Sequence, residues 1–235
     1  MGDVIRILIK CAVAMVLGIF EGNGAVYFFN KMPGKWFCDY GQEPTAEMMD
    51  PYTQRIKSTP WKYLFSMLFI VLNIVMVMDS IQFMVAATLT LWLLLEMSIG
   101  DIKYRIIPDQ LLLLLAVCGL GFIIYNGSWQ TCLLGTAIGF GIMFLIALIG
   151  KFTYKRDTLG GGDIKLFTCL GFILGPSGVL MVFMLTSFIS AGHYVFLMAR
   201  KRIGMKDTMP MVPYIALSTM IYLVFLYGKL DFISL

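Results

Sequence analysis

Charged residues are scarce in this sequence of 235 residues. Only 14% of the residues are charged, 59% are hydrophobic, and the mean hydropathy is +0.84. The polar side chains of a soluble domain could not cover so much apolar surface. This composition excludes an ordinary soluble protein, and we expect an all-α polytopic membrane protein in which the bilayer is the solvent.

Cysteine and histidine are also scarce. The five cysteines show no C-x-x-C spacing, and the one histidine, His193, has no carboxylate or cysteine at ligand spacing. These absences argue against a zinc site and against a disulfide framework. We interpret His193 as a packed or hydrogen-bonding residue. The net charge of +4 is small, and we expect no nucleic-acid partner.

Long apolar runs bounded by charges, glycine or proline predict about eight transmembrane or half-spanning helices. The expected spans are 4–29, 63–78, 81–99, 110–125, 131–150, 178–198 and 212–228. A run at 164–174 reaches only about half a bilayer at ~1.5 Å per residue, so we expect a half-helix, broken from the next span by "GPSG" at 175–178. Three glycines in the fifth span suggest close helix packing: Gly135, Gly139 and Gly141.

The basic residues predict the sidedness of these spans. Four segments, 30–62, 100–110, 151–165 and 200–211, hold 15 of the 18 lysines and arginines, whereas the turns between them hold none. Cytoplasmic loops carry this excess. We therefore expect a multi-pass protein of the inner, cytoplasmic membrane with both termini outside. The expected domains are a first transmembrane helix (1–29), a cytoplasmic segment (30–62) and a helical membrane domain (63–235).

Two aspartates fall in cytoplasmic loops separated by two spans, so they lie at similar membrane depth. Asp101 stands in "IGDIKYRIIPDQ" and Asp163 in "TLGGGDIKLF". Acids at the membrane surface or below are expensive and indicate function. Two adjacent carboxyl groups cannot both ionise easily, so they share a proton, and one becomes a base for water while the other remains an acid. This is the chemistry of an aspartyl protease.

Helix capping is the alternative interpretation of these acids. Asp163 begins an apolar helix and could be a plain N-cap, and Asp109, after Pro108, is interpreted as an N-cap. Asp101 does not fit this explanation, because it is expected to follow a helix C-terminus, where the helix dipole disfavours an anion.

Several neighbours of the aspartates are candidate site residues. Gly160, Gly161 and Gly162 would let a substrate backbone approach and would allow positive φ ahead of Asp163. Two lysines, Lys103 and Lys165, could tune the aspartates or hold a substrate carboxylate. Glu96, inside an apolar run, is expected to face the protein interior and is a further candidate.

Four stretches together resemble a known family. "GDIKYRIIPDQL" at 100–111, "GGGDIKLF" at 160–167, "MPMVPYIAL" at 209–217 and "GIFEGNGAVYFFNKMP" at 18–33 are similar to elements of the type IV prepilin peptidases. These membrane aspartyl proteases, of the G-x-G-D type, cut the leader from prepilins and pseudopilins at the cytoplasmic face, in type IV pilus and type II secretion systems. The resemblance places the two catalytic aspartates at Asp101 and Asp163.

The sequence also departs from the family. Bacterial members usually carry two C-x-x-C pairs that bind zinc and accompany N-methylation of the new pilin N-terminus, but segment 34–62 keeps only Cys38. One cysteine cannot supply four thiolates, so zinc is not expected. S-adenosylmethionine would be needed only if methyltransferase activity is retained, and a donor-binding role for Glu21 and Asn23 is in doubt. Proteolysis itself would require no cofactor.

The resemblance implies a type IV prepilin or pseudopilin substrate, with a basic leader before a long apolar helix. Five acids are expected to help attract that leader: Asp39, Glu43, Glu47, Asp50 and Asp157. Other interpretations are a protease of the presenilin or signal peptide peptidase type, which also uses G-x-G-D, a small membrane transporter, and a silent pilus-assembly scaffold. The tyrosine-preceded aspartate of the presenilin type is not found here, because "IGD" precedes a basic turn.

Overall fold

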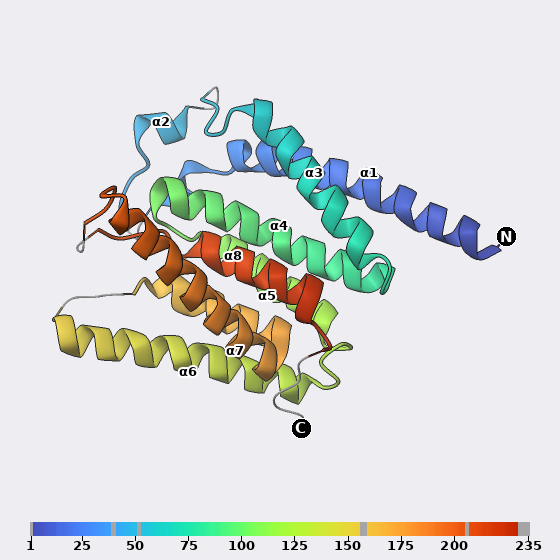
Figure 1. Ribbon diagram of the computed structural model, residues 1–235. Coiled ribbons are helices and arrows are strands. Elements are labelled where there is room, and N and C mark those ends of the chain that lie inside the picture. The colour runs from blue at the N-terminus through green and yellow to red at the C-terminus, as the bar shows by residue number, and fades with distance from the viewer. Residues whose placement is uncertain (1, 39–40, 51–52, 156–158, 205–206, 230–235) are drawn as a thin grey trace. The chain divides into compact units, whose positions relative to one another are not determined.

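The computed structural model describes residues 2–38, 41–50, 53–155, 159–204 and 207–229. All regular elements within these ranges are helices, without any strand (Figure 1), so the all-α expectation is confirmed. The chain divides into two compact units, Met1–Glu96 and Met97–Leu235, and the division falls inside helix α4 (Ile81–Tyr104). Each unit is described by itself.

The first unit is built on an antiparallel hairpin of α1 (Gly2–Lys31) and α3 (Ser58–Met76), which run side by side in Figure 1. The close approach depends on glycine in α1. A Cβ atom on Gly18 would lie 2.5 Å from the backbone nitrogen of Ile70, and one on Gly22 would collide with the backbone of Ser66. Larger residues at these two positions would force the helices apart.

The segment between these helices folds back onto the end of α1. It contains a 3₁₀ turn, η1 (Gly34–Phe37), and a short helix, α2 (Ala46–Met49). Arg55 donates hydrogen bonds to the carbonyl oxygens of Met32 at 2.6 Å and Met48 at 3.0 Å. The Asn30 amide bonds to both the N–H and the carbonyl of Ile56. These contacts satisfy backbone groups at the helix end.

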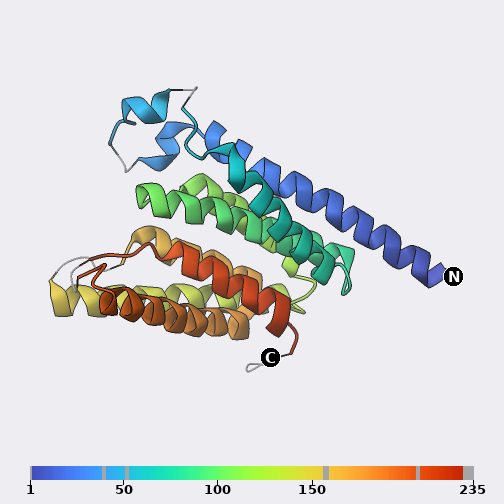
Figure 2. The same ribbon diagram turned by 45° about the horizontal axis from the view of Figure 1, so that its top comes forward.

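The second unit contains the end of α4 and the remaining helices. These are α5 (Asp109–Gly119), η2 (Leu120–Phe122), α6 (Trp129–Tyr154), α7 (Gly161–Ala199), α8 (Val212–Ile221) and a π-helical turn, η3 (Tyr222–Leu226). Helices α6 and α7 pack side by side (Figure 2). The backbones of Gly135 and Gly171 touch, and Gly139 packs on Phe167. The packing prediction was wrong for Gly141, which faces open space.

Helix α7 is broken where the sequence predicts it. Gly175 has φ 70° and ψ −178°, a conformation that side chains disfavour, and Pro176 follows it. The amide of Asn126 donates to the carbonyl of Ile173 at 2.9 Å, just before the break. The segment before Gly175 is therefore a half-helix, as expected, although it begins at Gly161 instead of residue 164.

The helices have the lengths of a polytopic membrane protein. Among the described residues, four helices are long and apolar enough to cross a membrane: α3, α4, α6 and α7. Shorter apolar helices cover Asp109–Phe122 and Val212–Leu226. The expected first span, 4–29, forms α1. These helices expose long apolar faces, which suits contact with lipid.

Candidate active site

Asp101 lies in the last turn of α4. The sequence places it after the helix end, and this was wrong by about one turn, because the helix continues to Tyr104. Arg105 then adopts a left-handed conformation with φ 58°, and its N–H donates to the Asp101 carbonyl at 3.1 Å. The Asp101 side chain is 8% exposed. Asp101 is therefore a buried acid in the last turn of a helix.

Asp163 occupies the third position of α7. Gly160 is the N-cap, and its N–H donates to the Asp163 carboxylate, while the Asp163 N–H donates to the Gly160 carbonyl at 3.1 Å. Asp163 thus caps the helix as expected, but it does so from the third helical residue and not from the N-cap position. This is the bond that the third residue of a capping box makes to the N–H of the N-cap residue. The Asp163 side chain is half-buried.

The two carboxyl groups lie close enough to interact electrostatically with one another. The start of α8 completes this arrangement. The Val212 N–H donates to Oδ2 of Asp101 at 3.0 Å, and the Met211 backbone also bonds to that carboxylate. Three helix ends that are distant in sequence therefore meet at the two aspartates. Amides at a helix N-terminus stabilise a negative charge.

The turn between α4 and α5 lies beside this site. Arg105 donates to the Thr208 carbonyl at 3.3 Å, which ties the turn to the segment before α8. Ile107 packs against Gly162, where an added Cβ would lie 3.1 Å from the isoleucine side chain. Gly162 thus serves close packing between the turn and α7.

The charged neighbours of the site have partners of their own. Lys165 is paired with Asp109, its ammonium 2.8 and 2.9 Å from the two carboxylate oxygens, and its role beside the aspartate pair stays a prediction. Asp109 is not the N-cap of α5. Pro108 has that position, and Asp109 is the first helical residue. Lys103 is exposed on the last turn of α4.

The three glycines differ from one another. None of them has positive φ, so that expectation was wrong: Gly160 has φ −70°, and Gly161 and Gly162 begin the helix. Gly161 is exposed, and an added Cβ there would meet no atom of the described residues within 4 Å. None of these residues blocks the approach of another chain to Gly161.

Two further acids belong to the first unit. Glu96 is fully buried, and neither carboxylate oxygen has a hydrogen-bond partner in the part of the chain that the structure describes. Glu21 is well bonded: its carboxylate accepts from the amide of buried Asn73 at 2.8 Å and from Thr88, and its carbonyl accepts from Trp92 at 3.0 Å. The sequence alone left the role of Glu21 open. It holds the packed helices together.

The other candidates contribute little to this site. The His193 ring forms a hydrogen bond with the Tyr214 hydroxyl at 2.6 Å, so the interpretation of His193 as a hydrogen-bonding residue is confirmed. Within the described ranges no cluster of three or more histidine, cysteine, aspartate or glutamate side chains could hold a metal ion. Asn23 donates to the Ile19 carbonyl in its own helix. Asp39 and Asp157 lie outside the described residues, as does the side chain of Glu47.

Fold and site together define a class: a polytopic α-helical membrane protein with two interacting aspartates at helix ends. Residues 87–195, which include both aspartates, match the model of the Type IV leader peptidase family. The resemblance to the type IV prepilin peptidases is confirmed over this segment. The stretches at 18–33 and 209–217 lie outside it.

Individual relatives agree with the family match. The chain is 31% identical over 138 residues to the "Prepilin leader peptidase/N-methyltransferase" of Bacillus subtilis, covering 58% of this chain and 53% of that protein. The protein of the same name from Aeromonas hydrophila is 28% identical over 135 residues, 57% of this chain and 47% of the relative. The chain thus spans about half the length of these curated relatives. No solved structure matches it.

Sequence reasoning missed the backbone donors to Asp101. Val212 is 111 residues from Asp101, and an apolar side chain gives no sign that its N–H serves an acid. A weak signal was present, because Pro213 favours the first turn of a helix and so marks amide groups left without intrahelical partners.

Proposed function

We propose that the protein is a membrane-embedded aspartyl endopeptidase that removes the leader of a type IV prepilin or pseudopilin. The observation that carries this proposal is the electrostatic interaction of Asp101 with Asp163 inside the segment that matches the leader peptidase family. The curated relatives are named prepilin leader peptidases, which supports the same function.

The proposed reaction is hydrolysis of one peptide bond. An ionised aspartate takes a proton from water, which attacks the scissile carbonyl carbon, while the protonated aspartate donates to the carbonyl oxygen. The tetrahedral intermediate then collapses, the C–N bond breaks, and the leaving amine receives a proton from the pair. No cofactor is needed for these steps.

The hydrogen bonds favour one assignment of roles. Asp101 accepts from backbone groups of Val212 and Met211 at the start of α8, and Arg105 adds a favourable charge interaction. These groups stabilise an anion. Asp101 is therefore the base, and Asp163, which faces the Asp101 charge, carries the shared proton and is the acid.

The proposed substrate enters beside the first turn of α7. A prepilin presents a short basic leader before an apolar helix, so its helix would lie in the bilayer while the cleavage point reaches the aspartates. The open space at Gly161 suits an extended backbone near Asp163. Glu43 and Asp50 are exposed and of the right charge for a basic leader.

The basic loops support a site at the cytoplasmic face of the inner membrane, with both termini outside. N-methylation of the cut pilin is not part of the proposal. The zinc motif of the family would need four thiolates, and segment 30–62 has one cysteine, Cys38. S-adenosylmethionine becomes relevant only if a methyltransferase activity is found.

Co-expression with a candidate prepilin tests the proposal. The wild-type chain should shift the precursor to the faster mature band on a gel, whereas D101N and D163N should leave the precursor intact. D109N is the matched control, because Asp109 is a nearby acid bonded to Lys165, and it should process normally. Processing at wild-type rate by D101N or D163N would overturn the proposal.

A further inference from the structure

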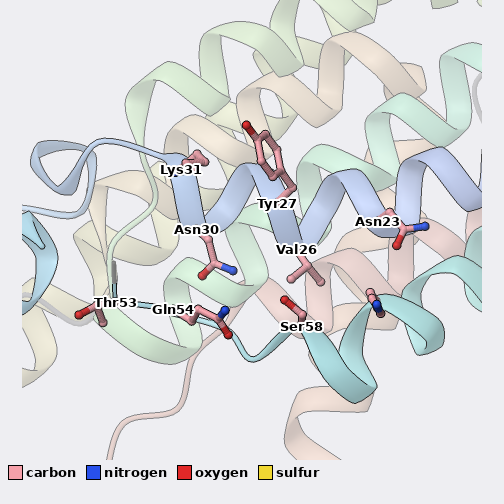
Figure 3. Close-up of a pocket in the computed structure, with 9 residues that line it drawn as sticks. Asn23, Val26, Tyr27, Asn30, Lys31, Thr53, Gln54 and Ser58 are labelled. Carbon is pink, nitrogen blue, oxygen red and sulfur yellow. The ribbon is translucent and has the colours of Figure 1, made fainter. Parts of the chain in front are cut away.

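A cavity of about 420 Å³ lies in the first unit. It sits where the α1–α3 hairpin opens into the segment between the two helices. Contacts between Lys10 and Val77 and between Asn30 and Ile56 show that α1 and α3 run antiparallel. The end of α1 is therefore level with the start of α3, and the cavity lies between them (Figure 3).

The lining is polar and carries positive charge. It combines two lysines, three amides, three hydroxyls and one apolar side chain: Lys31, Lys62, Asn23, Asn30, Gln54, Thr53, Ser58, Tyr27 and Val26. Figure 3 shows Asn30 and Val26 on the side of α1 that faces Gln54 and Ser58. Among the described residues that line the cavity, none is a carboxylate, and the nearby Asp50 accepts a bond from Thr53 at 2.8 Å. The amides of Asn23 and Asn30 bond to backbone groups of the protein. The two lysines, Gln54 and Ser58 are then the donors that suit an anion with several oxygen atoms.

Exposed aromatic side chains near the cavity narrow the choice of anion. Tyr27 lines the cavity, and Trp61 and Tyr63 flank the lining residue Lys62 in the chain; these three aromatic side chains are 68%, 45% and 63% exposed. Exposed tyrosine and tryptophan mark the membrane–water interface, at the level of lipid headgroups. The Lys62 ammonium lies 4.8 Å from the centre of the Tyr63 ring, which holds it at this level.

Farther along the same hairpin the surface is apolar. Phe20, Leu64 and Met67 are 71%, 52% and 68% exposed, and they lie toward the middle of the two helices. A lipid whose phosphate enters the cavity would therefore find an apolar surface for its acyl chains. A water-soluble phosphate would not use that surface.

We propose that this cavity binds the phosphate of an anionic phospholipid headgroup, held by Lys31 and Lys62 and by the side chains of Gln54 and Ser58. The expected cytoplasmic position of segment 30–62 agrees, because anionic lipids make that leaflet negative. The bound lipid would join the end of α1 to the start of α3. This site is independent of the proposed peptidase function.

The test measures lipid binding to the purified full chain in detergent by native mass spectrometry. The probe is phosphatidylglycerol, with phosphatidylcholine for comparison. The wild-type chain should hold one phosphatidylglycerol tightly. K31Q/K62Q should bind it about 30-fold more weakly, because each basic group near a membrane surface contributes roughly a fivefold change in affinity.

A matched control is K35Q/K57Q, which removes the same charge from exposed lysines of the same segment that do not line the cavity. It should bind as the wild type does. K31R retains the charge, so it should also bind normally and shows that a loss in K31Q/K62Q is not a packing defect. Circular dichroism checks that every variant is folded.

Three results would overturn the proposal. Equal losses in K31Q/K62Q and K35Q/K57Q would mean general charge attraction without a site. Displacement of the lipid by inorganic phosphate at equal concentration would make a soluble phosphate the ligand. Binding of S-adenosylmethionine to the cavity in place of the lipid would assign it to a cationic ligand.

Discussion

Each of the two units has acidic side chains among its packed helices, and the hydrogen-bond partners of these acids differ between the units. In the first unit the Glu21 carboxylate is bonded by the side chains of Asn73 and Thr88. In the second unit the aspartates lie at helix ends, and backbone amides of Val212 and Gly160 bond to them. The side-chain partners of Glu21 therefore make it part of the packing between helices. The backbone partners of Asp101 and Asp163 hold these carboxylates in place and leave their other oxygen atoms for chemistry.

Removing the aspartates should have the largest effect. D101N and D163N should each lower the cleavage rate of the purified enzyme about 10²- to 10⁴-fold, the usual contribution of an acid or base. The double variant should be no slower than the worse single variant, because the two groups act as one unit. Cleavage rates measured on a purified prepilin check this, and additive losses would argue against a pair.

A smaller effect is expected at Gly161, where the site is open. G161A should raise KM about tenfold, because an added methyl group would meet the substrate backbone. The free energy of unfolding should not fall, since an added Cβ would meet no atom of the described residues within 4 Å and φ is not positive. Thermal unfolding and KM are measured together. An unchanged KM would show that the substrate takes another path.

The packed acid of the first unit should affect stability instead. N73A removes the side-chain donor to Glu21 and should lower the free energy of unfolding by about 1–3 kcal/mol, with kcat kept within about twofold. N23A is the control, because Asn23 is exposed and its bond to the Ile19 carbonyl lies within its own helix. If N73A left thermal unfolding unchanged but reduced cleavage, Glu21 would belong to the chemistry.

The exposed ion pair should have the smallest effect. K165Q should change the free energy of unfolding by less than about 1 kcal/mol, because Lys165 and Asp109 are 52% and 42% exposed. Cleavage should change little. D109N should match it, and a tenfold loss of cleavage in K165Q alone would support the prediction that this lysine tunes the aspartates.

Much of this arrangement could be predicted because it depends on local patterns. Apolar runs identify the helices, "GPSG" marks the break at Gly175, and the basic loops predict that Asp101 and Asp163 share one side of the membrane. The rest depends on contacts across the chain. The pairing of Lys165 with Asp109 spans 56 residues, and no pattern in either helix records it.

Helix boundaries were the other source of error. The polar stretch "GDIKYR" predicts that Asp101 follows a helix, but the helix continues through these residues to Tyr104. Pro108 took the N-cap position because its fixed φ suits a helix start, and this moved Asp109 into the first turn. Both shifts are about one turn or less, yet they decide which groups can meet.

The end of α4 and the start of α7 bring two acids together, and the proposed chemistry depends on this meeting. Cross-linking in membranes examines it without relying on activity. In a background without native cysteines, D101C/D163C should be joined in high yield by a short bifunctional thiol reagent. K151C/D163C, which uses an exposed position at the end of α6, should give little product. A yield for D101C/D163C no higher than for K151C/D163C would mean that the two aspartates do not form a pair.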